Sequence, residues 1–257
     1  VFELGINGSG EMTNLIKTLQ PHYCLVTGIE NSHIGNFRNF NHLIDNKLKI
    51  FNSKRLISGV INCDYNFKYI KKKINKKVKL LNTDALIKKI IKNNTYFHIN
   101  FTHNNRRHLI TSKRGGFYIN IATLTYLFIK TFVNKFRSNN FFYEKAIIES
   151  RGNEVSAFIG SKKVRFFDHS YNASPYSLNM QILSFNERNI NQKVYILGSM
   201  KELGDHSDFF HKQIIEMAIK LNFKTIFVGY EFYKFKKQFT KFNFYKNYIP
   251  VIRYLNQ

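Results

Sequence analysis

The chain has 257 residues, 44% of them hydrophobic, and a formal net charge of +24. The hydrophobic share excludes a disordered chain and suffices for one large or two ordinary domains, while only two cysteines exclude a disulfide framework and a cysteine-bound zinc. Cys24 and Cys63 each lie in an apolar run, which predicts buried free thiols in a reducing compartment.

The first half of the chain predicts a mainly parallel sheet flanked by helices. Apolar runs alternate with helical patterns in the order strand 1–4, helix 10–19, strand 23–28, helix 40–51 and strand 57–63. A repeated strand–helix order with short connections is typical of parallel α/β sheets. Two antiparallel strands at 95–101 and 107–113 then precede a long, buried helix at 116–136, whose polar interruptions exclude a membrane span.

A polar, irregular segment separates this half from a second α/β unit. The order there is strand 164–170, helix 175–185, strand 193–199, helix 207–221 and strand 224–230. We therefore place a domain boundary near Ile148, which divides the chain into residues 1–148 and residues 149–257.

Polar clusters follow two strands of the first half, where open parallel sheets bind ligands. Glu3 lies within an apolar run, where an unpaired carboxylate would be costly, and glycines follow it; a plain glycine-rich turn explains the glycines equally well. His33 follows the strand at 23–28, although a lone histidine is more often structural than a ligand. At adjacent strand ends, Glu3 and His33 together would suit magnesium or manganese.

The stretch "FFDHSYNASPYSLNM" forms a third cluster, between a strand and a helix. Asp168 ends the strand, and Pro175 stands near the start of the helix, where proline is favoured. Asp168, Ser170 and Asn172 could simply satisfy loop and helix amides. The alternative is that Asp168 holds ribose hydroxyls, as strand-end carboxylates do in nucleotide sites.

Five segments in order resemble the Mur ligases, the ATP-dependent amino-acid ligases of peptidoglycan synthesis. They are "ELGINGSGEM", "NSHIGNF", "INCD", "FDHSYNASP" and "LGSMKELGDHSDFFH". "SYNA" and "GSMKELG" are the most specific, and they resemble the branch that adds D-alanyl-D-alanine to UDP-N-acetylmuramoyl-tripeptide. The resemblance implies an α/β fold, with a partial central ATPase domain at residues 1–148 and a truncated, Rossmann-like C-terminal domain at residues 149–257.

The same resemblance implies a reaction in two steps. ATP phosphorylates the terminal carboxylate of the tripeptide, and the amine of D-alanyl-D-alanine then attacks the acyl phosphate. It further implies ATP and Mg²⁺ as bound groups, a cytoplasmic monomer, and neither nucleic acid nor membrane as partner.

Position by position, Glu3 and His33 resemble the magnesium ligands of the family. Lys47, fourteen residues after His33, resembles a lysine that CO2 carbamylates into a further ligand and that serves catalysis. Taken alone, Lys47 is one more lysine of a lysine-rich chain. Lys49 stands where an acidic residue is usual.

The nucleotide positions come from both halves. Asn120 resembles the asparagine that reads adenine, and Arg151 in "SRGNE" resembles a catalytic arginine that reaches the phosphates. Asp168 resembles a nucleotide-contacting aspartate, with Tyr171 and Asn172 beside it. The loop at 201–211 would face the dipeptide. Two further departures from the pattern are Ile119, where the family has a histidine, and His169, where a second acidic residue is usual.

The motifs present predict a piece of a larger ligase. No G-x-x-x-x-G-K-S/T phosphate loop occurs in the chain, and the final basic segment of the family is not found. Phosphate-loop amides and their lysine supply most contacts to a triphosphate. We therefore expect these residues alone to bind ATP weakly and to be inactive.

Two alternatives remain beside this interpretation. One is a relative that uses another amino acid or a folate. The other is a degenerate or split relative, or a basic module that binds nucleic acid. The net charge and the lysine-rich cluster "KYIKKKINKKVKLL" favour nucleic-acid binding. However, Lys, Asn, Ile, Phe and Tyr are enriched together without Trp, which an AT-rich genome explains, and the cluster itself is typical of a solvated helix face and loop.

Overall fold

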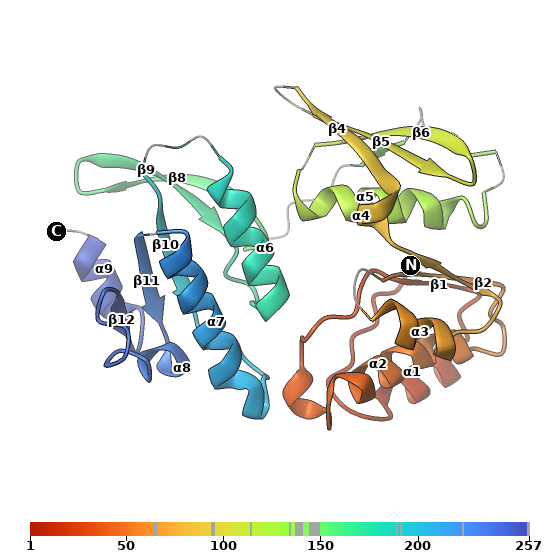
Figure 1. Ribbon diagram of the computed structural model, residues 1–257, viewed down its shortest axis with the longest axis horizontal. Coiled ribbons are helices and arrows are strands. Elements are labelled where there is room, and N and C mark those ends of the chain that lie inside the picture. Colours follow the sequence, from red (N-terminus) through yellow and green to blue (C-terminus); the bar gives the residue numbers. More distant parts are fainter. Residues whose placement is uncertain are drawn as a thin grey trace. The chain divides into compact units, whose positions relative to one another are not determined.

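The computed structural model describes residues 1–257 except 64–65, 94–95, 114, 134, 137–140, 144–149, 189, 191, 223 and 256–257 (Figure 1). The chain divides into two compact units, residues 1–30 with 37–145, and residues 31–36 with 146–257. The boundary predicted near Ile148 falls outside the described residues. Within the described residues, no helix is both long and apolar enough to cross a membrane.

A three-stranded parallel sheet forms the first layer of the first unit. Its strands are β1 (Tyr23–Val26), β2 (Ser58–Asn62) and β3 (Val78–Leu81), in that order, and its helices are α1 (Glu11–Leu19), α2 (Phe40–Leu48) and α3 (Phe67–Lys73). The predicted parallel sheet with helices is confirmed. Strand β3 was missed because three lysines in its vicinity mask Val78 and Leu81, which are the buried positions of the strand.

The strand predicted at residues 1–4 was wrong. Residues 1–6 form no helix or strand, and Val1, Phe2 and Glu3 are exposed. Four residues do not hold an extended conformation unless a neighbouring strand pairs with their backbone groups, and no described strand pairs with these. The argument that Glu3 is a buried carboxylate therefore fails.

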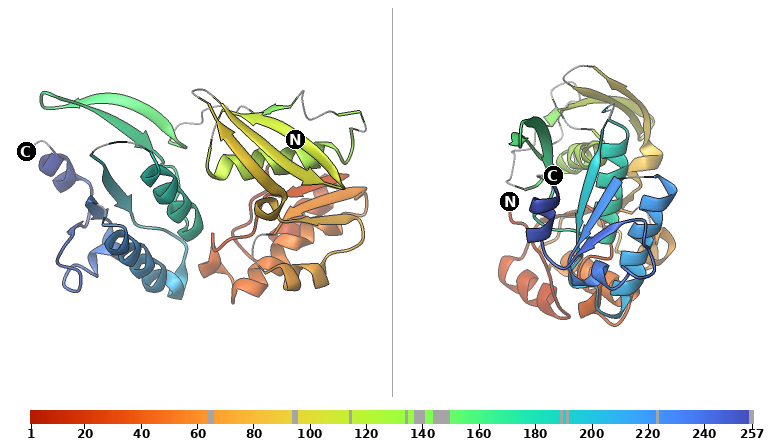
Figure 2. Two further views of the ribbon diagram at one scale, coloured as in Figure 1. Left: turned by 45° about the horizontal axis from the view of Figure 1, so that its top comes forward. Right: turned by 90° about the vertical axis from the view of Figure 1, so that its left-hand side faces the viewer.

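A second, four-stranded sheet completes the first unit, and the left view of Figure 2 shows its strands, in yellow and yellow-green, side by side. The order is β4 (Ile87–Lys92), β5 (Phe97–His103), β6 (Arg106–Ser112) and β7 (Phe142–Tyr143). The predicted antiparallel pair is β5–β6. Strand β4 at the edge and strand β7 were not predicted.

Helix α5 (Phe117–Ile129) packs against both sheets of the first unit. Its Leu124, Tyr126 and Leu127 share one buried cluster with Val60 of the parallel sheet and Ile99 of the other sheet. A helix covered on opposite sides must be apolar around most of its circumference, as this one is. The helix predicted to reach residue 136 ends at Ile129, where a turn follows.

The second unit has a parallel sheet of its own. Strands β10 (Val194–Gly198), β11 (Lys224–Val228) and β12 (Asn243–Tyr245) are accompanied by α6 (Pro175–Asn186), α7 (Ser207–Lys220), α8 (Tyr230–Tyr233) and α9 (Ile249–Leu255). Ser174 and Ser177 form a capping box that begins α6. The elements after β11, which are α8, β12 and α9, were not predicted, because the apolar pattern weakens there.

The strand predicted at 164–170 is not part of this parallel sheet. It is β9 (Lys162–Asp168), which pairs in antiparallel register with β8 (Asn153–Ile159). Ile159 and Lys162 are partners, so Gly160 and Ser161 form a two-residue hairpin turn, with Gly160 at φ 58°. The sequence reading missed this turn and with it β8, and Asp168 consequently ends a hairpin.

Alanine substitutions of Ile90 and Ile99 show how much packing under α5 contributes to the stability of the first unit. The two residues are direct partners in the β4–β5 pair, yet Ile99 is 0% exposed and Ile90 is 47% exposed. Ile99→Ala should lower the free energy of unfolding by about 2–5 kcal/mol, because it opens a cavity under α5. Ile90→Ala, the matched control, should cost less than about 1 kcal/mol. Urea unfolding measures both, and equal losses would contradict this account of the core.

Candidate functional site

Helix α2 carries Lys47 and is tied to the glycine-rich segment that precedes α1. Asn39 begins α2 by accepting a hydrogen bond from His42 N at 2.9 Å. Asn46 is buried, and its Oδ1 accepts from Gly10 N at 3.2 Å and from Ser9 Oγ at 3.3 Å. Ser9 and Gly10 are thereby held against α2, next to the position of Lys47. Sequence reasoning missed Asn46, and a single asparagine in an Asn-rich chain offers no signal for it.

The environment of Lys47 makes its ammonium group easier to deprotonate. Burial lowers the pKa of Lys47, and the charge of Glu30 offsets this effect in part. A neutral amine is the form that attacks electrophiles such as CO2. Lys49, which stands where an acidic residue is usual in the family, has a partner in the structure: its Nζ donates to Asn46 Oδ1 at 2.9 Å.

The predicted metal ligands are divided between the two units. Glu3 and Lys47 belong to the first, and His33 belongs to the second. In the part of the chain that the structure describes, no three His, Cys, Asp or Glu side chains lie together as a metal site. The Nδ1 atom of His33 pairs with Glu202, so its Nε2 remains as the atom suited to a metal. The magnesium site stays a prediction.

Residues 31–36 lie against the loop predicted to face the dipeptide. Gly35 N donates to Glu202 O at 2.9 Å. A Cβ atom on Gly35 would lie 2.4 Å from Gly204 N, so only glycine fits there. The structure therefore brings His33 together with residues 201–206, which the sequence alone did not predict.

Asp168 closes the base of the β8–β9 hairpin. Its Oδ1 accepts from Ser170 N and its Oδ2 from Ser150 Oγ, each at 2.9 Å. Hydrogen bonds from Ser170, and less strongly from Ser150, lower the pKa of Asp168. The capping role is thus present, yet an ionised carboxylate offers about four acceptor positions, so these hydrogen bonds do not use up its capacity for a ligand. Ser150 was not predicted.

The same turn holds a cation over an aromatic ring. The guanidinium carbon of Arg151 lies 4.1 Å from the centroid of the Tyr171 ring, and Tyr171 N donates to Ser150 O at 3.1 Å. Tyr171 is 62% exposed, and Asn172 beside it is exposed as well. Three predicted residues, Arg151, Asp168 and Tyr171, therefore come together. They combine a cation, a carboxylate and an exposed aromatic ring.

Asn120 lies in the first turns of α5. Its Nδ2 donates to Oδ1 of Asp84 on α4 (Thr83–Leu86) at 2.6 Å. Ile119, which stands where the family has a histidine, is buried in the hydrophobic cluster that contains α5, and this packing explains the apolar residue. Sequence reasoning did not single out Asp84.

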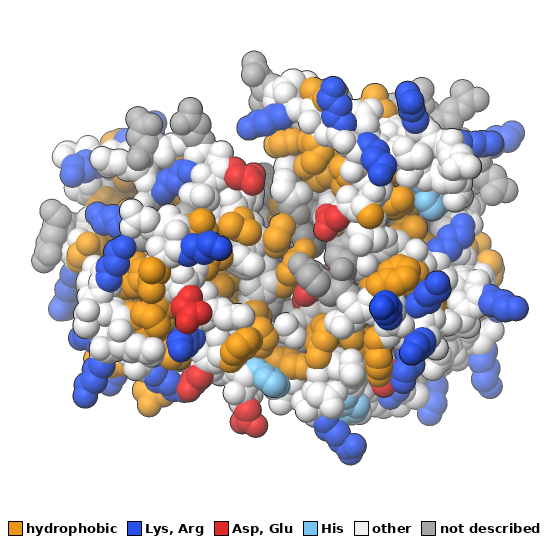
Figure 3. All heavy atoms as spheres, in the orientation of Figure 1, with side chains coloured by type: hydrophobic (Ala, Val, Ile, Leu, Met, Phe, Trp, Pro, Cys, Tyr) orange, Lys and Arg blue, Asp and Glu red, His pale blue; other side chains and the backbone are white. Residues whose placement is uncertain are grey.

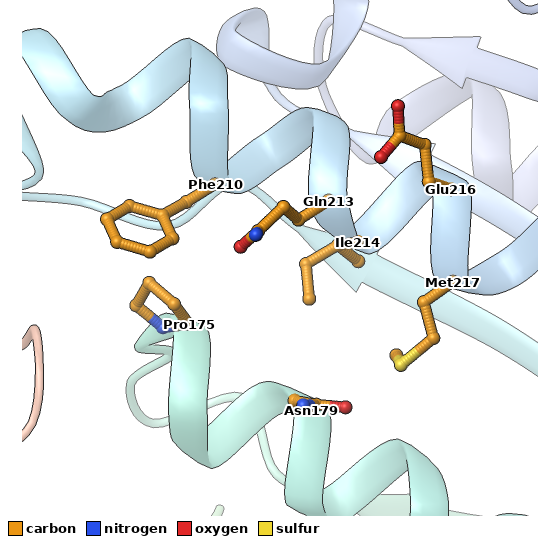
Figure 4. Close-up of a pocket in the computed structure, with 7 residues that line it drawn as sticks. All are labelled: Pro175, Asn179, Phe210, Gln213, Ile214, Glu216 and Met217. Carbon is orange, nitrogen blue, oxygen red and sulfur yellow. The ribbon is translucent and has the colours of Figure 1, made fainter. Parts of the chain in front are cut away.

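A groove of about 330 Å³ runs between α6 and α7 (Figure 4). Asn179 on α6 faces Met217 on α7 across it, and its Oδ1 is buried with no hydrogen-bond partner among the described residues. Phe210 at one end belongs to the predicted dipeptide loop. The groove mixes apolar walls with amide and carboxylate groups, and it is lined by Pro175, Asn179, Phe210, Gln213, Ile214, Glu216 and Met217.

A basic hollow lies beside α8. It has a volume of about 530 Å³ and is lined by Tyr230, Tyr233, Lys234, Lys236, Lys237 and Lys246. Lysine and arginine side chains are nevertheless spread over the visible face of both units rather than gathered in one stripe (Figure 3). On that face, the positive charges are scattered, as expected for a chain rich in lysine, and they do not line a continuous nucleic-acid groove (Figure 3).

Residues 1–127 match the family model of the Mur ligase middle domain. The first half of the chain is therefore similar to a Mur ligase middle domain. The resemblance found in the sequence motifs is thereby confirmed. The match covers β1 to β6 and nearly all of α5, which together hold Lys47 and Asn120.

Curated relatives extend the likeness into the second unit. The UDP-N-acetylmuramoyl-tripeptide–D-alanyl-D-alanine ligase of Borreliella burgdorferi is 29% identical over 251 residues, which are 90% of this chain and 51% of that enzyme. The ligase of the same name from Rickettsia prowazekii is 25% identical over 244 residues, which are 84% of this chain and 50% of that enzyme. The chain spans about half the length of these relatives.

Solved Mur ligases share the fold. MurF from Acinetobacter baumannii matches with a TM-score of 0.83 at 18% identity, over 99% of this chain and 57% of that chain. MurF from Thermotoga maritima, solved in complex with ADP, matches with a TM-score of 0.69 at 18% identity, over 97% and 64%. The predicted α/β class is confirmed.

Lys47 should show its lowered pKa in its chemical reactivity. The neutral amine appears at lower pH when the pKa falls, so half-maximal acylation of Lys47 should occur at lower pH than that of Lys71, an exposed lysine on α3. Limited acylation across a pH series, followed by peptide mass spectrometry, reports both residues from one sample. Coinciding pH midpoints would contradict the assigned effect of burial.

Proposed function

We propose that this chain is the nucleotide-handling part of a ligase that joins D-alanyl-D-alanine to UDP-N-acetylmuramoyl-tripeptide. The observation that carries the proposal is the cluster of Arg151, Asp168 and Tyr171 around the "SYNA" stretch. It is supported by two relatives of that name, each of which matches more than four fifths of the chain.

The proposed reaction has two steps. The tripeptide carboxylate takes the γ-phosphoryl group of ATP, and ADP leaves. The dipeptide amine, which has lost its proton, then bonds to the carbonyl carbon of the acyl phosphate, and phosphate leaves from the tetrahedral intermediate. Two anions meet in the first step, so cations must offset their repulsion. Arg151 would supply one of them at the phosphates, as a catalytic residue.

The residues around the nucleotide divide the remaining tasks. The carboxylate of Asp168 would hold ribose hydroxyls, with Tyr171 and Asn172 at the same surface, and Asn120 would read adenine. Residues 201–211 would receive the dipeptide. The ligase would work as a monomer in the cytoplasm.

The proposal also includes magnesium and a carbamylated lysine. Lys47 fits a carbamate because its pKa is lowered, and His33 fits a metal through Nε2. The exposed Glu3 would complete the set. When bound, the metal would neutralise phosphate charge during transfer.

A phosphate-release assay on the full-length gene product tests the proposed reaction. With UDP-N-acetylmuramoyl-tripeptide and ATP present, phosphate release should depend on D-alanyl-D-alanine. Single amino acids and a folate acceptor serve as controls in the same assay. Release that ignores the dipeptide would overturn the proposal, and a preference for one amino acid would assign another ligase activity.

Asp168→Ala in the full-length protein should raise the KM for ATP by about ten-fold or more. A charge-assisted hydrogen bond contributes roughly 1.5–3 kcal/mol, and 1.4 kcal/mol is a factor of ten. The KM for D-alanyl-D-alanine should stay nearly unchanged. Steady-state kinetics with each substrate varied in turn measures both constants.

Ser150→Ala is the matched control for this prediction. It removes one hydrogen bond of the Asp168 turn but leaves the carboxylate in place. It should lower stability by about 1 kcal/mol while the KM for ATP barely moves. If Asp168→Ala behaves in the same way, Asp168 is a structural cap and its proposed nucleotide role fails.

A further inference from the structure

The hydrogen bond between Asp84 and Asn120 determines which way the Asn120 amide points. An asparagine side chain has a donor end, Nδ2, and an acceptor end, Oδ1, which look alike in shape. An ionised aspartate can only accept hydrogen bonds. Nδ2 of Asn120 must therefore face Asp84 Oδ1, at 2.6 Å, and Oδ1 of Asn120 must face away from it.

Asp84 is itself held in place by the sheet. Thr83, its neighbour on α4, is fully buried, and both its N and its Oγ1 donate to Oδ1 of Asn62 at 3.2 Å. Asn62 ends β2, the central strand of the parallel sheet. Asn82 begins α4 by accepting from Ala85 N at 2.9 Å. A chain of hydrogen bonds thus runs from β2 through α4 to the amide of Asn120.

We propose that Asp84 is a positioning residue that sets the choice of purine through Asn120. With Nδ2 held by Asp84, Oδ1 of Asn120 is presented to the nucleotide as an acceptor. An acceptor matches the 6-amino group of adenine and opposes the 6-oxo group of hypoxanthine or guanine. This inference rests on the proposed function, in which Asn120 contacts the base.

Asp84→Asn in the full-length gene product tests the inference. The new amide can accept or donate, so Asn120 can turn over and offer either end to the base. Calorimetric Kd values for ADP and IDP are the main readout, and KM values for ATP and ITP are the second. The wild type should prefer ADP by about ten-fold or more, because a mismatched polar pair leaves groups unsatisfied. The variant should lower this ratio to within about three-fold of unity, partly by tighter IDP binding.

Two matched variants separate positioning from stability. Asp45→Asn makes the same chemical change at an aspartate that accepts from Tyr69 and Lys73, and it should leave the ADP to IDP ratio unchanged. Asp84→Glu keeps the acceptor-only character and should retain most of the preference. General damage to the fold would weaken ADP and IDP alike and would leave the ratio where it was.

The outcomes distinguish this inference from the proposed function. A wild type that discriminates between ADP and IDP, with an unchanged ratio in Asp84→Asn, overturns the role of Asp84 alone. A wild type that binds ADP and IDP equally also overturns it, while the ligase proposal stands. A wild type that binds neither nucleotide overturns both.

Discussion

The burial of α5 against two sheets is the constraint on which the first unit depends. Val60 and Ile99 lie in different sheets and reach the same helix, so neither sheet can shift without opening the core around Leu124 and Tyr126. Such a helix leaves little surface for polar chemistry. Asn120 can be polar because it lies close to the N-terminal end of α5, half-buried beside Asp84. Asn120, to which we assign contact with the base, therefore lies where the packing leaves α5 partly exposed.

The second unit uses a different means to fix its site. A single carboxylate, that of Asp168, joins the segment before β8 to the segment after β9 by accepting hydrogen bonds from Ser150 and Ser170. The hairpin ends are thereby closed, and Arg151 and Tyr171 are in contact in the same segments. The structural role of Asp168 is compatible with its proposed role, because the hydrogen bonds that orient its carboxylate also favour its charged form.

The sequence predicted the alternation of strands and helices well wherever apolar runs were clean, as at β1, β2, β10 and β11. It failed where the deciding information was not local. Residues 1–4 look like a strand, but strand formation depends on a partner that the sequence does not reveal. Strand β8 was hidden because its two-residue turn at Gly160 was not recognised. The meeting of Arg151 with Tyr171 follows from that turn, and Asn46 and Asp84 gain their roles only through partners distant in the chain.

The close approach of Gly35 and Gly204 limits how this protein can evolve. The two residues are separated by 169 positions, matching the separation of His33 and Glu202, yet each occupies the space where the other would carry a side chain. Gly204 also has φ 54°, so replacement there meets both a steric and a conformational barrier. Even alanine, the smallest substitution, would clash at either position unless the backbone shifts. Neutral substitutions in this region are therefore confined to the residues around the two glycines. A protein that loses either glycine needs a changed backbone to keep His33 in contact with Glu202.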